Sequence, residues 1–426
     1  MFSNFYKLQI SAPVPFIIGK CDYEAYPEFD DMKTSLNRTK SEMDSLFTGP
    51  YAANVSTLSN MFRPTSGIAI ELTTKYNAQI VTRAWVKFYE IYHHFADKLF
   101  VPFTGINAFC NAELPGASVC ALNHFMKTRY QPKSFNWRAN SLVPERERNA
   151  LEDKYGLWEC NQANWLMDNS NNGDTTSQHN VENFAAKLDS FKPNLYTHDA
   201  GISVEDSQDP SSYNKQESKN AKLHYGAALA GLLTLSKGGN FIAKQYTLFE
   251  PVTVSLLVFY ASMFSEFYLV KPSSSGMNNS ESYLVGIGFM GLLPQNREFL
   301  LTNLDNEIDR PIISRREIFD RAPHAIGQIR QFNTKRTDDQ IKSIKKTISL
   351  LDKYKDNPRN ANREKFQLYE SFNSAFFKSV LVKKIREDHK IPSKSRITNR
   401  SNSRNYPRPS TSTSIQGVDG WITKTR

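Results

Sequence analysis

Strand-like and helix-like segments alternate along the middle of this 426-residue chain. A helical pattern over 82–99 is followed by a strand-like run over 105–112 and a second helical stretch over 117–129. The alternation continues to strand-like segments at 266–270 and 282–289, which are connected by a polar loop. Helical connections allow neighbouring strands to run parallel, whereas a short loop makes them antiparallel. The sequence therefore predicts an α/β fold with a doubly wound, mostly parallel sheet that ends in an antiparallel hairpin.

The intervening elements extend the same pattern. They are a strand at 134–139, a helix at 181–188, a strand at 195–198, a helix at 215–236, a strand at 241–244 and a helix at 251–263. The stretch 156–166 fits neither pattern. Ligands bind to open sheets of this kind at the carboxyl ends of the strands. Residues that directly follow strands are therefore the first candidates for a site.

Pattern and composition divide the chain into four parts. They are an N-terminal extension at 1–76 with one or two helices, the α/β domain at 77–325, a basic helical region at 326–390 and a basic, disordered tail at 391–426. Within the extension a helix is expected near 32–46, and the helical region is interrupted near 357–358.

The positive charge of the chain is concentrated at its C-terminal end. The formal net charge is +10, yet residues 335–390 hold 15 basic and 8 acidic residues, and 391–426 hold 7 basic and 1 acidic. Residues 1–334 are slightly acidic, with a net charge of −3. A basic appendage of this kind suits a polyanion such as nucleic acid. A solvated helical face followed by a disordered tail accounts for the same charges.

Several other classes of protein are disfavoured. No apolar run approaches the roughly 20 residues of a membrane-spanning helix, and the first residues do not resemble a secretion signal. The four cysteines form no C-x-x-C pair, which indicates reduced thiols and no zinc site. We therefore expect a soluble, intracellular protein. Neither G-x-G-x-x-G nor a P-loop is present, so the sequence offers no obvious dinucleotide or nucleotide site.

Polar residues follow several of the predicted strands. The turn 113–116, with the sequence Glu-Leu-Pro-Gly, comes after the first strand of the alternation. A glycine there allows close approach of a ligand, and the next helix begins with unpaired N–H groups. Taken alone, this sequence also fits an ordinary tight turn.

Four charged residues stand at strand ends or on the adjacent helix. They are Lys87, Asp199, Lys244 and Glu281. Each alone is typical of a surface charge, but together they can form one cluster of alternating charge. A lysine close to a second lysine loses basicity and can act as a base near neutral pH.

The segment 83–91, with the sequence RAWVKFYEI, resembles the opening helix of the FtsJ/RrmJ-like RNA ribose 2′-O-methyltransferases. The cap-type, Adrift-like branch of that family is similar in further segments. These are 111–117 with 121–125, 137–142, 173–174 with 180–184, 271–275 and 279–289. The resemblance covers about half of the chain.

This resemblance implies a Rossmann-like, S-adenosylmethionine-dependent methyltransferase that modifies RNA, with the 5′ cap region of mRNA as its substrate and no metal. The family's catalytic Lys–Asp–Lys–Glu tetrad would be Lys87, Asp199, Lys244 and Glu281. The implied cofactor-binding residues are Glu113, Pro115, Gly116, Ala117, Trp137, Asn140, Asp174 and Asp199. Lys244 would take the 2′-hydroxyl proton or steer its lone pair. Lys87 would lower the pKa of Lys244, and the two carboxylates would orient the lysines.

The chain departs from the family pattern in two places. The cofactor loop reads Pro-Gly-Ala instead of Pro-Gly-Gly, and no acidic residue for the cofactor ribose is evident near Trp137 or Asn140. These departures keep open a methyltransferase-fold protein that binds RNA or a partner with little turnover. The basic tail keeps open a structural or packaging protein. Methylation of ribosomal or transfer RNA is a third alternative, and the terminal regions are candidates for binding another protein.

Overall fold

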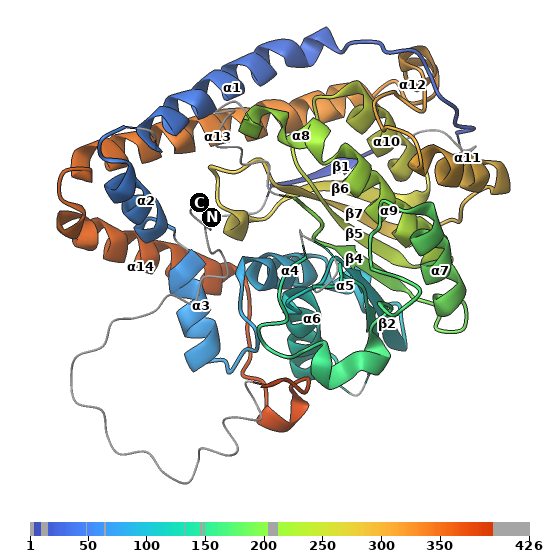
Figure 1. Cartoon of the computed structure of the whole chain (residues 1–426), viewed down its shortest axis with the longest axis horizontal. Coiled ribbons are helices and arrows are strands. Elements are labelled where there is room, and N and C mark those ends of the chain that lie inside the picture. The colour runs from blue at the N-terminus through green and yellow to red at the C-terminus, as the bar shows by residue number, and fades with distance from the viewer. Residues whose placement is uncertain are drawn as a thin grey trace.

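The computed structural model describes residues 4–9, 16–47, 49–63, 65–131, 133–144, 147, 150–202 and 212–394. Within these residues a seven-stranded sheet has the order β1-β6-β7-β5-β4-β2-β3 (Figure 1). Its strands are β1 (Asn4–Leu8), β2 (Gly105–Asn111), β3 (Ser134–Ala139), β4 (Leu195–His198), β5 (Asn240–Gln245), β6 (Phe264–Lys271) and β7 (Ser282–Phe289).

The pairing of the strands confirms the predicted fold class. Strands β3, β2, β4 and β5 run parallel, whereas β7 runs antiparallel to both β5 and β6. Strand β1 pairs antiparallel with β6 at the edge of the sheet. No strand was expected in the N-terminal extension, because five residues at a sheet edge give too short a pattern to recognise.

The helices of the α/β domain lie on both faces of the sheet. They are α4 (Arg83–His94), α5 (Ala96–Leu99), α6 (Ala117–Arg129), α7 (Gln178–Leu188), α8 (Gln216–Lys219), α9 (Ala221–Thr234), α10 (Pro251–Ala261), α11 (Pro294–Leu304) and α12 (Arg315–Arg321). The helix expected at 215–236 is divided at Asn220, whose side chain bonds Ile202 N and Gln216 O. The ambiguous stretch 156–166 contains a short 3₁₀ helix (Glu159–Asn164).

Side-chain alternation along the strands explains the two layers. In β5, Phe241 and Ala243 belong to the core that α7, α9 and α10 cover, whereas Ile242 belongs to the core beneath α4 and α6. Successive residues of a strand point to opposite faces, so a strand buried on both faces reads as a continuous apolar run. This is why the central strands were recognisable from sequence.

In the described residues, five further helices surround the domain. They are α1 (Asp30–Asp44), α2 (Ala52–Met61), α3 (Thr65–Thr74), α13 (Ala325–Tyr354) and α14 (Asn362–Ser379). Helices α1 and α13 lie side by side along one side of the molecule, and α14 packs on α3 (Figure 1). Buried Ile329, Phe332 and Ile344 of α13 share the core that contains Leu284 of β7. The basic helical region thus continues the core of the domain, and its predicted interruption near 357–358 is confirmed.

The chain returns to the α/β domain after α14. The return segment, residues 380–394, bonds to Tyr76 through Ile385 N and to Tyr155 through Lys394 N, at 3.1 and 2.8 Å. Residues 391–394, expected in the tail, are part of this packed segment, and Ile391 is buried. The rest of the expected tail lies outside the described residues. Within the described part of the chain, no helix is long and apolar enough to cross a bilayer.

Candidate active site

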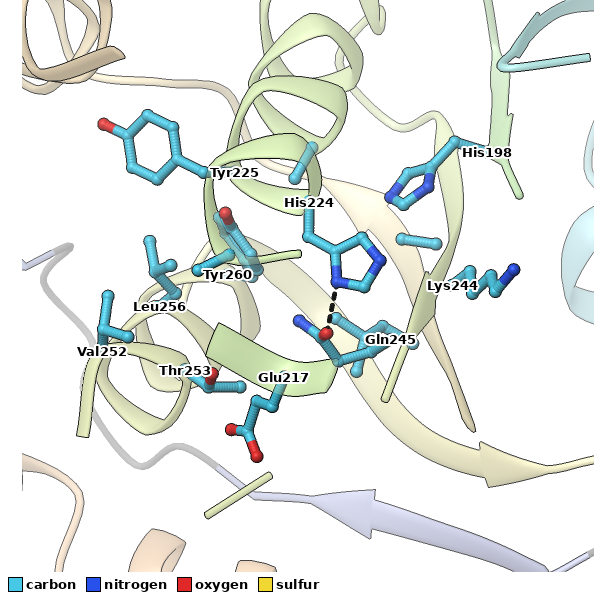
Figure 2. Close-up of a pocket in the computed structure, with 14 residues that line it drawn as sticks. His198, Glu217, His224, Tyr225, Lys244, Gln245, Val252, Thr253, Leu256 and Tyr260 are labelled. Carbon is cyan, nitrogen blue, oxygen red and sulfur yellow. Dashed lines mark hydrogen bonds between the residues drawn. The ribbon is translucent and has the colours of Figure 1, made fainter. Parts of the chain in front are cut away.

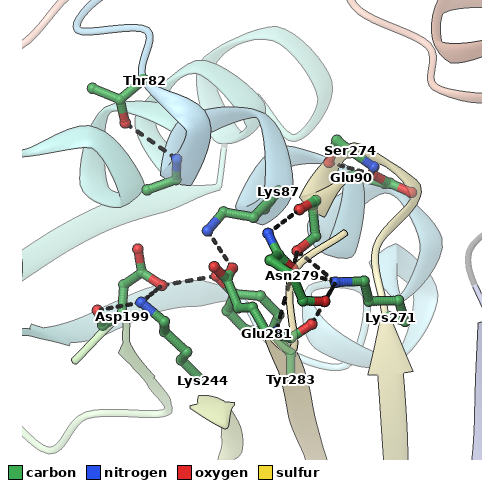
Figure 3. A network of polar contacts seen from close by, with 12 residues as sticks. Thr82, Lys87, Glu90, Asp199, Lys244, Lys271, Ser274, Asn279, Glu281 and Tyr283 are labelled. Atoms are coloured by element: carbon green, nitrogen blue, oxygen red, sulfur yellow. Dashed lines mark hydrogen bonds and ion pairs between the residues drawn. The ribbon is translucent and has the colours of Figure 1, made fainter. Parts of the chain in front are cut away.

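The four charged residues singled out from the sequence meet at the end of the sheet where β4 and β5 terminate (Figure 3). Lys87 lies on α4, Asp199 directly after β4, Lys244 in β5 and Glu281 directly before β7. Lys244 Nζ lies 3.6 Å from Asp199 Oδ1, and Lys87 Nζ forms an ion pair with Glu281 Oε1. The fold therefore arranges the four residues as two ion pairs.

Tyr283 joins these two pairs. Its hydroxyl lies 2.8 Å from Asp199 Oδ1 and 2.8 Å from Glu281 Oε1, so its one proton can bond either carboxylate. Tyr283 stands opposite Lys244 in the register of β7 and β5. Sequence reasoning missed this residue. The available signal was its position two residues after Glu281, which places both on one face of an extended chain.

The cluster is largely shielded from water. The side chains of Lys87, Lys244, Glu281 and Asp199 are 6%, 12%, 12% and 20% exposed. Burial alone lowers the pKa of Lys244, but the charges of Asp199 and Glu281 outweigh it, so this pKa lies above its usual value. Burial raises the pKa of Glu281, but the surrounding lysines outweigh it and hold this pKa below its usual range.

The expectation that the pKa of Lys244 lies below its usual value is therefore wrong for this structure. Lys87 is paired with Glu281, and the carboxylates of Asp199 and Glu281 act on Lys244 with the opposite sign. Lys244 accordingly carries its proton at neutral pH. The lysine can donate a hydrogen bond to a substrate oxygen but is a poor proton acceptor.

A second polar network holds the loop that leads to Glu281. The carboxylate of Glu90, one turn after Lys87 on α4, accepts hydrogen bonds from the backbone N–H groups of Ser273 and Ser274 at 2.8 and 2.9 Å. Lys271 Nζ donates to the backbone oxygen of Glu281 at 2.7 Å. One helix thus supplies both the partner of Glu281 and an anchor for its loop (Figure 3).

A narrow pocket lies behind Lys244, between β5, α9 and α10 (Figure 2). His224 Nδ1 lies 2.5 Å from Gln245 Oε1, and burial together with the charge of Lys244 lowers the pKa of His224 to about 4. Burial also holds the pKa of His198 well below its usual value. The two histidines are therefore uncharged at neutral pH and add no positive charge beside Lys244.

The predicted cofactor loop follows β2 and opens α6. The carboxylate of Glu113 accepts a hydrogen bond from Val119 N at 2.9 Å and another from the Ser118 hydroxyl. It therefore caps the first turn of α6, and burial raises its pKa to about 7. Pro115 follows Leu114 in this loop, and Ala117 is the buried first residue of α6.

Gly116 is the one position in this loop that requires glycine. Its φ of +104° lies in the left-handed region, and a Cβ atom there would lie 2.0 Å from Leu157 Cδ2. Leu157 is buried and belongs to the stretch whose pattern was ambiguous in the sequence. The stretch therefore forms a wall beside the cofactor loop.

The remaining predicted cofactor residues lie on neighbouring segments. The Asn140 amide donates to Asn111 Oδ1 at 2.8 Å and to the Gly173 backbone oxygen at 3.0 Å. Its Oδ1 atom is buried and has no hydrogen bond from the described residues. Asp174 Oδ1 accepts from the N–H and the hydroxyl of Thr176, each at 2.8 Å. Trp137 packs edge-on against Trp165.

The structure brings most of these residues together. Glu113 N donates to Asn140 O at 3.0 Å, and Asn140 in turn bonds Gly173, the neighbour of Asp174. The charge of Asp199 contributes to the raised pKa of Glu113, which connects this group to the lysine–carboxylate cluster. The side chains of Glu113 and Asp174 are engaged within the protein, so their local role is to shape the loops.

The doubly wound sheet has the Rossmann-like fold class of methyltransferases, with a glycine turn after β2 and a lysine–carboxylate cluster at the carboxyl ends of β4 and β5. Residues 80–289 match the family model described as FtsJ-like methyltransferase. This part of the chain belongs to that family.

Three relatives bear on the function. The probable methyltransferase of African swine fever virus (isolate Pig/Kenya/KEN-50/1950) is 43% identical over 294 residues, which span 65% of this chain and 66% of that protein. An uncharacterized protein of Acanthamoeba polyphaga mimivirus is 34% identical over 239 residues, 55% of this chain and 29% of its own length. A cap-specific mRNA (nucleoside-2′-O-)-methyltransferase 2 of Drosophila melanogaster is 26% identical over 276 residues, 63% of this chain and 38% of the fly protein. The chain thus spans just under two thirds of the first relative and much less of the other two.

Proposed function

We propose that this chain transfers a methyl group from S-adenosylmethionine to a ribose 2′-oxygen of RNA, in the 5′ cap region of mRNA. The observation that carries the proposal is the buried cluster Lys87–Glu281 and Lys244–Asp199, bridged by Tyr283, within an FtsJ-like methyltransferase domain. The name of the fly relative supports RNA and the cap as substrate. The basic residues at the C-terminal end supply a sequence-independent attraction for phosphates.

The residues at the proposed cofactor site fit S-adenosylmethionine. The buried Oδ1 atom of Asn140 is an acceptor without a donor among the described residues. The backbone of Asn140 bonds Glu113 N, in the same loop as the left-handed Gly116, which has no side chain. We assign cofactor contacts to the 113–117 loop, Asn140 and the second oxygen of Asp174. The bound cofactor would supply a methyl group already activated on a sulfonium sulfur, so no metal is invoked.

In this proposal Lys244 acts as a hydrogen-bond donor. The raised pKa keeps its amine protonated, and the amine would hold the 2′-oxygen with a lone pair directed at the methyl group. The 2′-hydroxyl proton, which the protonated amine cannot accept, would leave to solvent as the methyl group is transferred. Asp199 holds the amine of Lys244, and the ion pair between Glu281 and Lys87 lies on the other side of Tyr283. Such alignment can contribute several kcal/mol to lowering a barrier. Of the two roles that the resemblance implies for Lys244, the geometry favours steering of the lone pair.

A second candidate function is an RNA-binding or virion scaffold of methyltransferase fold with little turnover. The observation that favours it is the packing of Leu157 directly over Gly116, together with the inward-turned carboxylate of Glu113. In either case we propose RNA as the main partner, with a protein partner through the terminal regions. Because two of these relatives are viral proteins, we propose that the chain acts at a cytoplasmic site of viral replication, with packaging in the virion as the alternative.

Calorimetric titration of the full chain with S-adenosylmethionine and S-adenosylhomocysteine separates these candidates. We expect saturable binding of both, weakened in Asp174→Asn, which keeps the turn oxygen bonded to Thr176 but removes the carboxylate charge. His179→Ala, an exposed change on α7, is the matched control and should bind like the wild type. Absence of binding by well-folded wild type would favour the scaffold.

Gly116→Asp is expected to weaken S-adenosylhomocysteine binding by about tenfold or more. The new side chain meets Leu157 and shifts the free loop out of its left-handed conformation, so binding would have to restore that conformation at a cost of about 1–3 kcal/mol. The same titration measures this loss, and the thermal unfolding midpoint tests whether the domain stays folded. Unchanged affinity would mean that the cofactor does not lie at this loop.

A further inference from the structure

The loop before Glu281 is held by a helix outside the family-matched region. Helix α13 spans 325–354, whereas the family model ends at residue 289. Three polar side chains of α13 bond the loop, namely Arg336, Gln340 and Thr347. Spacings of four and seven residues place them on one face of the helix.

The contacts fall on three consecutive loop residues. Arg336 Nη2 donates to the backbone oxygen of Asn279 at 2.6 Å. Gln340 Nε2 donates to Asn278 O at 2.9 Å and to the Ser280 hydroxyl at 3.2 Å. Two turns further along α13, Thr347 Oγ1 accepts a hydrogen bond from Asn278 Nδ2 at 2.8 Å. The helix therefore fixes the backbone immediately before Glu281.

Asn279 transmits this restraint to the cluster. Its Oδ1 accepts from Lys271 Nζ at 2.6 Å and from the backbone N–H of Glu281 at 3.3 Å. Lys271 Nζ also donates to Glu281 O, so Glu281 is bonded at both of its backbone polar groups (Figure 3). The carboxylate of Glu281 then meets Lys87 and Tyr283.

Arg336 faces inward and is unlike the basic residues around it. Its side chain is buried, with the residue 6% exposed, and Gln340 is 1% exposed. The neighbouring Lys335 side chain is 50% exposed and pairs with Asp339. Lys335 makes no bond to the loop in the described residues, whereas Arg336 is committed to it.

We propose that Arg336 is a positioning residue for methyl transfer, which from α13 fixes the 278–281 backbone and thereby holds Glu281 against Lys87. Its catalytic consequence rests on the proposed function. The inference makes the C-terminal helical region part of the active unit and separates this role from any attraction of RNA.

The test uses the full chain with Arg336→Met, which removes the donors at similar size, and Arg336→Lys, which keeps a cation. Lys335→Met is the matched control on the exposed side of the same turn. Amide hydrogen exchange of residues 272–283 is measured by mass spectrometry, and kcat and KM are measured with RNA. We expect faster exchange of this segment and a 10- to 100-fold lower kcat in Arg336→Met, with KM for RNA unchanged. Arg336→Lys should recover part of both effects, and Lys335→Met should match the wild type in kcat and in the exchange of residues 272–283.

A double variant decides whether the effect passes through Glu281. If it does, Arg336→Met adds little further loss to Glu281→Gln, because residues acting as a unit are not additive. Full additivity, or unchanged exchange of 272–283 in folded Arg336→Met and Arg336→Lys, would overturn the inference. If wild type transfers no methyl group while the exchange effect is present, the proposed function fails and the positioning of the loop stands.

Discussion

Lys244→Ala is expected to lower kcat for methyl transfer by about 10³-fold while S-adenosylhomocysteine binds as in the wild type. The amine of Lys244 is held by Asp199 Oδ1 at the longer distance of 3.6 Å, whereas Lys87 is closely paired with Glu281, so Lys244 is the lysine we assign to the substrate oxygen. Removing this amine takes away the donor that orients the 2′-oxygen. Transfer is measured with a radiolabelled methyl donor on capped RNA, and cofactor affinity by calorimetry.

The controls for this prediction lie within the same strand and its surroundings. Lys237→Ala removes an exposed lysine that precedes the other end of β5, and it should leave kcat unchanged. Lys244→Arg keeps the positive charge but enlarges the head group, so partial activity is expected if alignment is the main contribution. Turnover by Lys244→Ala close to that of the wild type would remove Lys244 from the catalytic assignment.

Removing residues 335–426 is expected to prevent stable folding. The cut falls inside α13 and deletes buried side chains on which all three cores depend. They are Ile344, Leu351, Phe372, Phe376 and Val380. Loss of a large buried side chain costs about 2–5 kcal/mol, and several such losses exceed the 5–15 kcal/mol by which a domain is normally stable.

The matched truncation removes only residues 395–426. It leaves every described contact in place, so the thermal unfolding midpoint should not change. This segment carries 6 basic residues and 1 acidic residue, and its loss should weaken RNA binding. Each lost phosphate contact flattens the dependence of log affinity on log salt by about 0.7 for a single strand. A stable, cooperatively unfolding 1–334 fragment would contradict the first expectation, and an unchanged salt slope would contradict the second.

The sequence predicted the parts of the fold that repeat a local pattern. The predicted helix 117–129 and strand 134–139 coincide with α6 and β3. Strand β1 escaped notice because it is short and lies at an edge. The division of a long helix at Asn220 depends on a contact with Ile202 that no local pattern contains.

The residues of the candidate site were predicted from the sequence, but the pairing of their charges was not. Resemblance to a family supplied Lys87, Asp199, Lys244 and Glu281, and the structure gathers them. Their charges interleave in space, so the pKa of Lys244 rises, which chain order alone could not indicate. The support from Arg336 joins residues 57 positions apart, and such contacts depend on how the whole chain packs.

The return segment 380–394 has a consequence for how the molecule loses its structure. It bonds the residues before α4 through Gln79, the helix α6 through Asn123, and the wall stretch through Asn161. Elements that share hydrogen bonds and a core tend to open together, as one cooperative unit. Detachment of this short segment would therefore loosen the Leu157 wall and the helix carrying Lys87 in the same event. The stability of the candidate site therefore depends on a segment that follows the family-matched region by about 90 residues.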